Sequence, residues 1–141
     1  MLPEFLLTWL LGALFGSLLF FAVTVAPTVF QALDIDQGGA FLRRLFPKYY
    51  LWGVVLSSLC LLAALTGDQD SWITACCTVI LAGFLYARQV LMPRINSARD
   101  GDREGDPVAA KRFRSLHLQS VVINALQLLL LLGLALAPAW L

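Results

Sequence analysis

The stretch SLHLQSVVINALQLLLLLGLALAPAWL, residues 115–141, contains no Asp, Glu, Lys or Arg. An α-helix rises 1.5 Å per residue, so roughly 20 apolar residues cross the hydrocarbon core of a bilayer. This stretch is therefore long enough to span a membrane by itself. The single histidine of the chain, His117, lies near its beginning.

Three further stretches without charged residues precede it, at 5–33, 49–67 and 71–87. The last of these is short, but it extends to Met92 if Arg88 runs its side chain along the lipid to the interface. The chain as a whole is 60% apolar and 13% charged, with a mean hydropathy of +0.79. These values lie outside the range of soluble domains and predict an integral membrane protein.

The four stretches predict an all-α fold, an integral membrane antiparallel four-helix bundle that forms a single domain over residues 1–141. The expected spans are about 5–33, 47–67, 71–92 and 115–138. Residues typical of helix ends mark several boundaries: Pro47 in the first turn of the second helix, Gly67 at its end, Asp70 or Ser71 capping the third helix, and Asp106 capping the fourth with Pro107 at its first position.

The basic residues predict the orientation of the bundle. All ten lie in the first loop, in the third loop or at the adjoining end of the third helix. Because basic loops stay in the cytoplasm, loops one and three should be cytoplasmic and both termini outside, in a cell inner membrane. The first segment has no basic start, so we expect it to be retained and not removed as a signal peptide.

Four polar residues form a stripe on the fourth helix. They are spaced 3, 4 and 3 apart, which at 100° per residue confines them to an arc of about 80°. Amides and hydroxyls are costly against acyl chains, so the stripe should face the interior of the bundle. Its members are His117, Ser120, Asn124 and Gln127.

Two interpretations of the stripe remain open. In the first, it holds helix four to its neighbours through hydrogen bonds, with His117 as an interfacial anchor. Alternatively it lines a polar cavity for a small solute or ion, with Arg88 or Arg94 attracting anions at the inner mouth. Proton transfer by His117 lacks a second ionisable residue for a relay. No Asp or Glu lies inside any span, so we do not expect an enzyme.

The sequence predicts no cofactor and no metal site. One histidine cannot form a His-rich site, and Cys60, Cys76 and Cys77 all lie inside apolar runs, where packing is their expected role. A thiolate cluster for a soft metal stays open as an alternative, because the three cysteines lie at similar distances from one short turn.

The expected partners are lipids. The segment KRFR, residues 111–114, should contact anionic lipid headgroups at the cytoplasmic side. Gly12 and Gly16 form a small-xxx-small pair, repeated by Gly53 and Ser57, which indicates close helix contact either within the chain or in a homo-oligomer. No nucleic-acid partner is expected.

Four segments carry a resemblance to a known family. They are VAPTVFQAL (25–33), RRLFPKYYLWG (43–53), MPRINSARD (92–100) and FRSLHLQSVVINAL (113–126). Together they resemble the transmembrane protein 205-like family, whose bacterial members are grouped under a domain of unknown function. The resemblance implies four membrane helices and a bacterial member, and it implies no reaction, cofactor or catalytic residue.

For function, two classes follow from these observations. One is a small transport or permeation component whose cavity is lined by helix four. The other is a non-enzymatic membrane scaffold or accessory subunit in which the same residues hold helices together. Because four helices alone make a poor alternating-access machine, transport would require a homo-oligomer.

Overall fold

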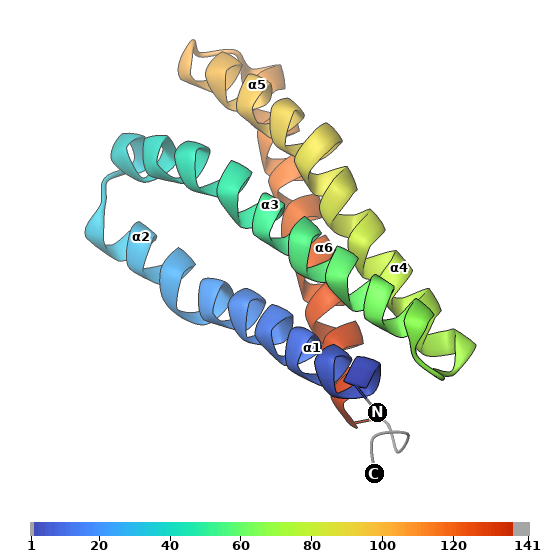
Figure 1. Ribbon diagram of the computed structural model, residues 1–141. Coiled ribbons are helices and arrows are strands. Elements are labelled where there is room, and N and C mark those ends of the chain that lie inside the picture. The colour runs from blue at the N-terminus through green and yellow to red at the C-terminus, as the bar shows by residue number, and fades with distance from the viewer. Residues whose placement is uncertain (1, 137–141) are drawn as a thin grey trace.

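The computed structural model describes residues 2–136, and over these residues all regular secondary structure is helical (Figure 1). Four long rods follow one another along the chain. Two of them are interrupted by a single π-helical turn. The elements are α1 (Leu2–Phe20), η1 (Phe21–Val25), α2 (Ala26–Ala32), α3 (Ile35–Thr66), α4 (Ser71–Tyr86), η2 (Ala87–Leu91), α5 (Met92–Arg103) and α6 (Pro107–Leu136).

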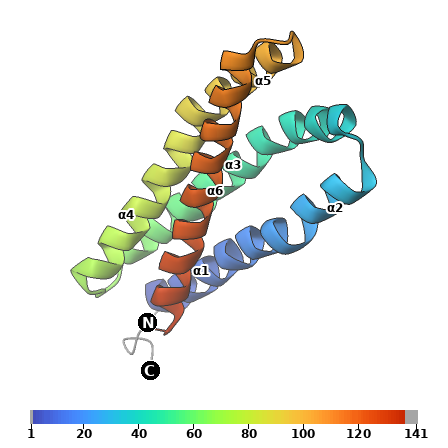
Figure 2. The same cartoon turned by 180° about the vertical axis from the view of Figure 1, so that it is seen from behind.

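The rods are antiparallel. The beginning of α1, the α3–α4 link and the end of α6 lie at one end of the bundle, and the α2–α3 and α5–α6 links lie at the other (Figures 1 and 2). The latter end carries the Lys and Arg residues, and we call it the basic end. Toward it, the rod formed by α1 and α2 diverges from α6, while α5 stays beside α6 (Figures 1 and 2).

Each rod is long and apolar enough to cross a membrane, by length and composition. The predicted fold class, an all-α bundle of four spanning helices, is confirmed over the described residues, and the chain is a multi-pass membrane protein. The expected end of the last span at residue 138 lies outside the described residues.

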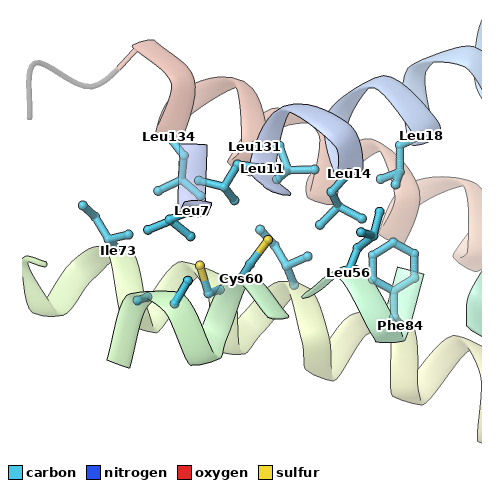
Figure 3. Packing of buried hydrophobic residues seen from close by; sticks show 14 of the residues in the cluster. Leu7, Leu11, Leu14, Leu18, Leu56, Cys60, Ile73, Phe84, Leu131 and Leu134 are labelled. Atoms are coloured by element: carbon cyan, nitrogen blue, oxygen red, sulfur yellow. The ribbon is translucent and has the colours of Figure 1, made fainter. Parts of the chain in front are cut away.

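The core lies between the four rods at the end opposite the basic end (Figure 3). Helix α1 contributes one leucine stripe with spacings of 4, 3 and 4, which places every member on the same face. This stripe consists of Leu7, Leu11, Leu14 and Leu18. The other rods meet it with buried side chains that include Leu56 and Cys60 from α3, Ile73 and Phe84 from α4, and Leu131 and Leu134 from α6.

Several predicted helix ends are observed. Gly67 is the C-cap of α3, where its N–H donates to the Ala63 carbonyl. The Asp106 carboxylate accepts a hydrogen bond of 2.9 Å from the Val108 N–H at the start of α6. Asp70 is the N-cap residue of α4, but its side chain makes no capping bond and instead accepts from the Trp72 indole at 3.3 Å.

The prediction that Pro47 lies in the first turn of the second helix is wrong. Helix α3 begins twelve residues earlier at Ile35, where the Asp34 side chain accepts a 2.7 Å hydrogen bond from the Gln37 N–H, and Pro47 lies in its interior. A proline there removes one intrahelical bond. The rest of the helix continues because the strong cap and the packing on both sides outweigh that loss.

The two π-helical turns occupy equivalent places in the two halves of the chain. Turn η1 ends two residues before Pro27, and η2 ends two residues before Pro93. A proline ring clashes with the carbonyl four residues earlier and cannot donate a hydrogen bond, and a wider turn relieves both problems. Each half thus consists of one interrupted rod followed by one continuous rod.

Small residues set the spacing of the bundle at α3. Gly53 is buried, and a Cβ added there would overlap the fully buried Phe84 ring of α4. Gly12 and Gly16, by contrast, are exposed, and a Cβ at either position would meet no other atom. The Gly53 pair therefore marks helix contact within the chain, whereas the Gly12 pair does not.

We predict that Gly53→Ala lowers the free energy of unfolding by about 1–3 kcal/mol, because the buried Phe84 ring cannot move aside without strain. Gly12→Ala is the matched control and should leave stability unchanged or raise it slightly. Both values can be measured by equilibrium unfolding in detergent. Equal effects of the two substitutions would contradict the close α3–α4 contact.

Candidate functional site

Three of the four stripe residues of α6 face the bundle. Ser120 and Gln127 are 6% and 4% exposed, and Asn124 is half-buried. The helical period of α6 carries all three to one side, toward α3 and α4. We call Ser120, Asn124 and Gln127 the polar seam.

Each seam residue bonds to protein. The Ser120 and Tyr50 hydroxyls lie 3.1 Å apart within hydrogen-bonding reach. The Tyr49 hydroxyl donates to the Asn124 carbonyl oxygen at 3.2 Å, and the Asn124 amide donates to the Ser120 backbone carbonyl at 3.2 Å. The seam therefore ties α6 to α3 through two neighbouring tyrosines.

The deepest seam residue crosses to α4. The Gln127 amide donates a 3.0 Å hydrogen bond to the Ile80 backbone carbonyl. Gly83 makes this approach possible, because a Cβ there would lie 2.8 Å from the Gln127 amide nitrogen. A carbonyl has two lone pairs, so Ile80 can accept this bond in addition to its helical one.

The two tyrosines belong to an aromatic cluster at the basic half of the bundle. Phe21 of η1 lies 4.4 Å from Tyr49, and Phe46 stacks on Tyr50 at 5.5 Å, both measured between ring centroids. The bonds of Tyr49 and Tyr50 to the seam were not predicted from the sequence. The signal in the sequence was a pair of adjacent tyrosines at the start of an apolar stretch.

His117 does not join the seam. Its side chain is exposed, and its ring stacks on Phe113 one turn earlier at 5.9 Å between centroids. The two stacked rings lie on α6 near the basic end. The structure thus separates the histidine from Ser120, Asn124 and Gln127, and only the last three act together.

Arg88 and Arg94 also lie apart from the seam. Arg88 is half-buried in η2, and its buried Nε has no hydrogen-bond partner among the described residues. Arg94 is exposed and lines a groove of about 670 Å³ between α5 and α6 together with Arg112. None of the seam residues lines that groove.

The cysteines lie in or beside the packed core. Cys60 and Cys77 are buried, Cys76 is half-buried, and all three are free thiols. Within residues 2–136, no group of three or more His, Cys, Asp or Glu side chains is placed to hold a metal ion. Cys60 and Cys77 thus fill space between α3 and α4.

Ion pairs join α3 to α5 at the basic end. Arg43 binds Asp100 through two hydrogen bonds of 2.7 and 3.0 Å, and Arg103 lies 3.3 Å from Asp36. The bonds from Arg43 lower the pKa of the Asp100 carboxyl below its ordinary value, and the same bonds raise the pKa of Arg43. Sequence reasoning assigned these residues to loops and missed the pairing.

The fold and the seam together define a small polytopic membrane protein in which hydrogen bonds of the polar seam join the last helix to α3 and α4. The family described as "Domain of unknown function (DUF4149)" matches residues 9–104, and the chain belongs to this family. The match ends before α6, so it does not include the seam.

A relative from Aquifex aeolicus (strain VF5), described as "Uncharacterized protein", is 30% identical over 128 residues. The similarity covers 91% of this chain and 87% of the relative. No solved structure matches the chain. These comparisons agree with a bacterial protein of this family. They assign no activity to the residues of the seam.

We predict that the Tyr50 and Ser120 hydroxyls are energetically coupled. In a double-mutant cycle of Tyr50→Phe and Ser120→Ala, the coupling energy should be about 0.6 kcal/mol and at most about 1.7 kcal/mol, the range for hydrogen bonds between membrane helices. Equilibrium unfolding of the four proteins in detergent measures it. A coupling energy of zero would mean that the two hydroxyls do not bond.

Proposed function

We propose that the protein is a non-enzymatic scaffold or accessory subunit of the bacterial inner membrane. The observation that supports this proposal is the pairing of the seam. Ser120, Asn124 and Gln127 each use their polar atoms on neighbouring helices or on α6 itself. Polar groups engaged in this way hold a bundle together, so a solute would have to compete with these bonds.

The distribution of acidic residues supports the non-enzymatic part of the proposal. All nine Asp and Glu residues lie at helix ends, in the links between helices or in the helical extensions at the basic end. Hydrolysis of a lipid or transfer of a group at membrane depth needs a general base or a nucleophile there. The seam offers hydroxyls and amides, with no carboxylate or imidazole bonded to them.

A permeation component is the second candidate, and one observation favours it. Asn124 and Tyr49 are half-buried, and the rod of α1 and α2 diverges from α6 toward the basic end (Figure 2). A small polar solute could therefore meet Asn124, whereas Ser120, the seam residue nearest the basic end, is buried. Arg88 and Arg94 would then act at a distance from the seam, and a homo-oligomer would complete the path.

The proposal also covers the relationship between two families and the orientation of the bundle in the membrane. The DUF4149 family and the transmembrane protein 205-like family would share one four-helix fold. The basic end would face the cytoplasm, where Lys111, Arg112 and Arg114 contact anionic headgroups, and both chain termini would face outward. The positions of the charges at one end of the rods support this orientation.

The two candidate functions differ in their response to loss of one seam amide. We predict that Asn124→Leu rescues a deletion strain as well as the wild-type gene does, in growth compared across metabolites and metal ions. Val122→Leu, at an exposed position of α6, is the matched control. If Asn124→Leu accumulated normally yet behaved like the deletion while Val122→Leu rescued, permeation would replace the scaffold proposal.

The orientation gives a separate prediction. In a chain with Cys60, Cys76 and Cys77 replaced by alanine, Asp68→Cys should react with a membrane-impermeant maleimide in intact spheroplasts. Glu104→Cys should react only after permeabilisation, because it lies in the α5–α6 link at the basic end. The reverse labelling pattern would show that the basic end faces outward.

A further inference from the structure

A groove lined by arginines lies between α3 and α5 at the basic end. Its volume is about 250 Å³. Four of its six lining residues are cations and none is a carboxylate, which distinguishes it from the neighbouring groove that Asp34, Asp36 and Asp102 line. We call it the arginine groove, and its lining residues are Gly39, Ala40, Arg43, Arg44, Arg99 and Arg103.

Two of the arginines are held in place by carboxylates. Arg43 is paired with Asp100, and Arg103 with Asp36. The two carboxylates thus pair with two of the four arginines and leave the other two without an ion pair among the described residues. The ion pairs orient the Arg43 and Arg103 guanidinium groups at the groove.

The Arg99 side chain is held by a hydrogen bond to a backbone carbonyl and by its close fit against Gly39. Its Nη2 donates a 2.9 Å hydrogen bond to the Ile35 carbonyl, and its guanidinium carbon lies 6.0 Å from the centre of the Phe113 ring. The guanidinium rests against Gly39, where a Cβ would occupy the same space. A guanidinium has five N–H donors, so most of those on Arg99 remain for a ligand.

Arg44 is the free cation of the groove. It is exposed, and no hydrogen bond or ion pair involves it among the described residues. Neither burial of the Arg44 side chain nor an ion pair explains why an arginine stands at this position. Together with Arg99, it gives the groove two guanidinium groups that form no direct ion pair among the described residues.

We propose that the arginine groove binds a phosphate group. Guanidinium groups match phosphate oxygens with paired N–H donors, and several of them around one site favour an anion with several oxygens. Arg43 and Arg44 precede the uncharged stretch that begins at Tyr49 by six and five residues, or about 8–9 Å along a helix. This is the depth of lipid headgroups, so the phosphate can come from a phospholipid or from solution.

The proposal rests on the membrane placement under Proposed function only for the choice of leaflet. The test uses the purified full chain in neutral detergent, so it does not depend on orientation, which cysteine labelling measures separately. Two probes are titrated: phosphatidylglycerol in mixed micelles, followed by native mass spectrometry, and inorganic phosphate, followed by calorimetry. Thermal midpoints of all variants report whether they fold.

Three variants separate the groove from general surface charge. Arg44→Gln removes the free cation, and Gly39→Ala displaces the Arg99 guanidinium while keeping every charge. Arg114→Gln is the matched control, since it removes one exposed charge of α6 outside the groove. We expect Arg44→Gln and Gly39→Ala each to weaken binding about tenfold or more, and Arg114→Gln by no more than about fivefold.

The two probes identify the source of the phosphate. Binding of phosphatidylglycerol alone indicates a lipid headgroup, and binding of inorganic phosphate that Arg44→Gln abolishes indicates a soluble anion; either result supports the groove. The proposal is overturned if neither probe binds the wild-type chain. It is also overturned if folded Arg44→Gln and Gly39→Ala lose no more affinity than Arg114→Gln.

Discussion

The arrangement of this bundle depends on one requirement. A polar side chain that is surrounded by hydrocarbon must form its hydrogen bonds with other parts of the protein. Gln127 lies in the membrane half of α6 opposite the basic end, where water cannot serve as its partner. Its amide reaches the Ile80 carbonyl because Gly83 leaves room for it. That bond decides which flank of α6 turns toward α4, and the Ser120–Tyr50 contact decides the flank toward α3.

The two ends of the bundle are held by different forces. At the end opposite the basic end, leucines of α1 pack against the other three rods with almost no exposed surface, and dispersion contacts hold α1 in place there. At the basic end, α3 and α5 meet through exposed ion pairs, each of which contributes little by itself. This difference agrees with the divergence of the rods toward the basic end (Figure 1).

The sequence was sufficient for features that depend on one helix alone. The four spans follow from local composition, and the inward side of Ser120, Asn124 and Gln127 follows from the period of α6 and the cost of exposed amides. The partners Tyr49, Tyr50 and the Ile80 carbonyl could not be predicted, because they depend on how α3 and α4 are rotated.

Other expectations failed for a physical reason. His117 shares the helical arc of the seam, yet it lies one turn nearer the basic end than Ser120, where its side chain is exposed and its ring stacks on Phe113 of the same helix. The segment before Pro47 carries charges that are typical of a loop. Asp34 nevertheless caps a helix there, and contacts with α5 stabilise the segment, a pairing between residues far apart in sequence.

The π-helical turns connect the prolines to this arrangement. A π turn inserts one residue into a helix and so rotates everything after it by about 100° relative to an uninterrupted helix. Turn η2 therefore sets which face of α5 meets α3. With it, Arg99 and Asp100 reach Ile35 and Arg43; without it, both side chains would be turned about a quarter of a circle away. Pro93 thus acts on the position of the ion pairs through the backbone, because the wider turn that it requires aligns the charged face of α5 with the beginning of α3.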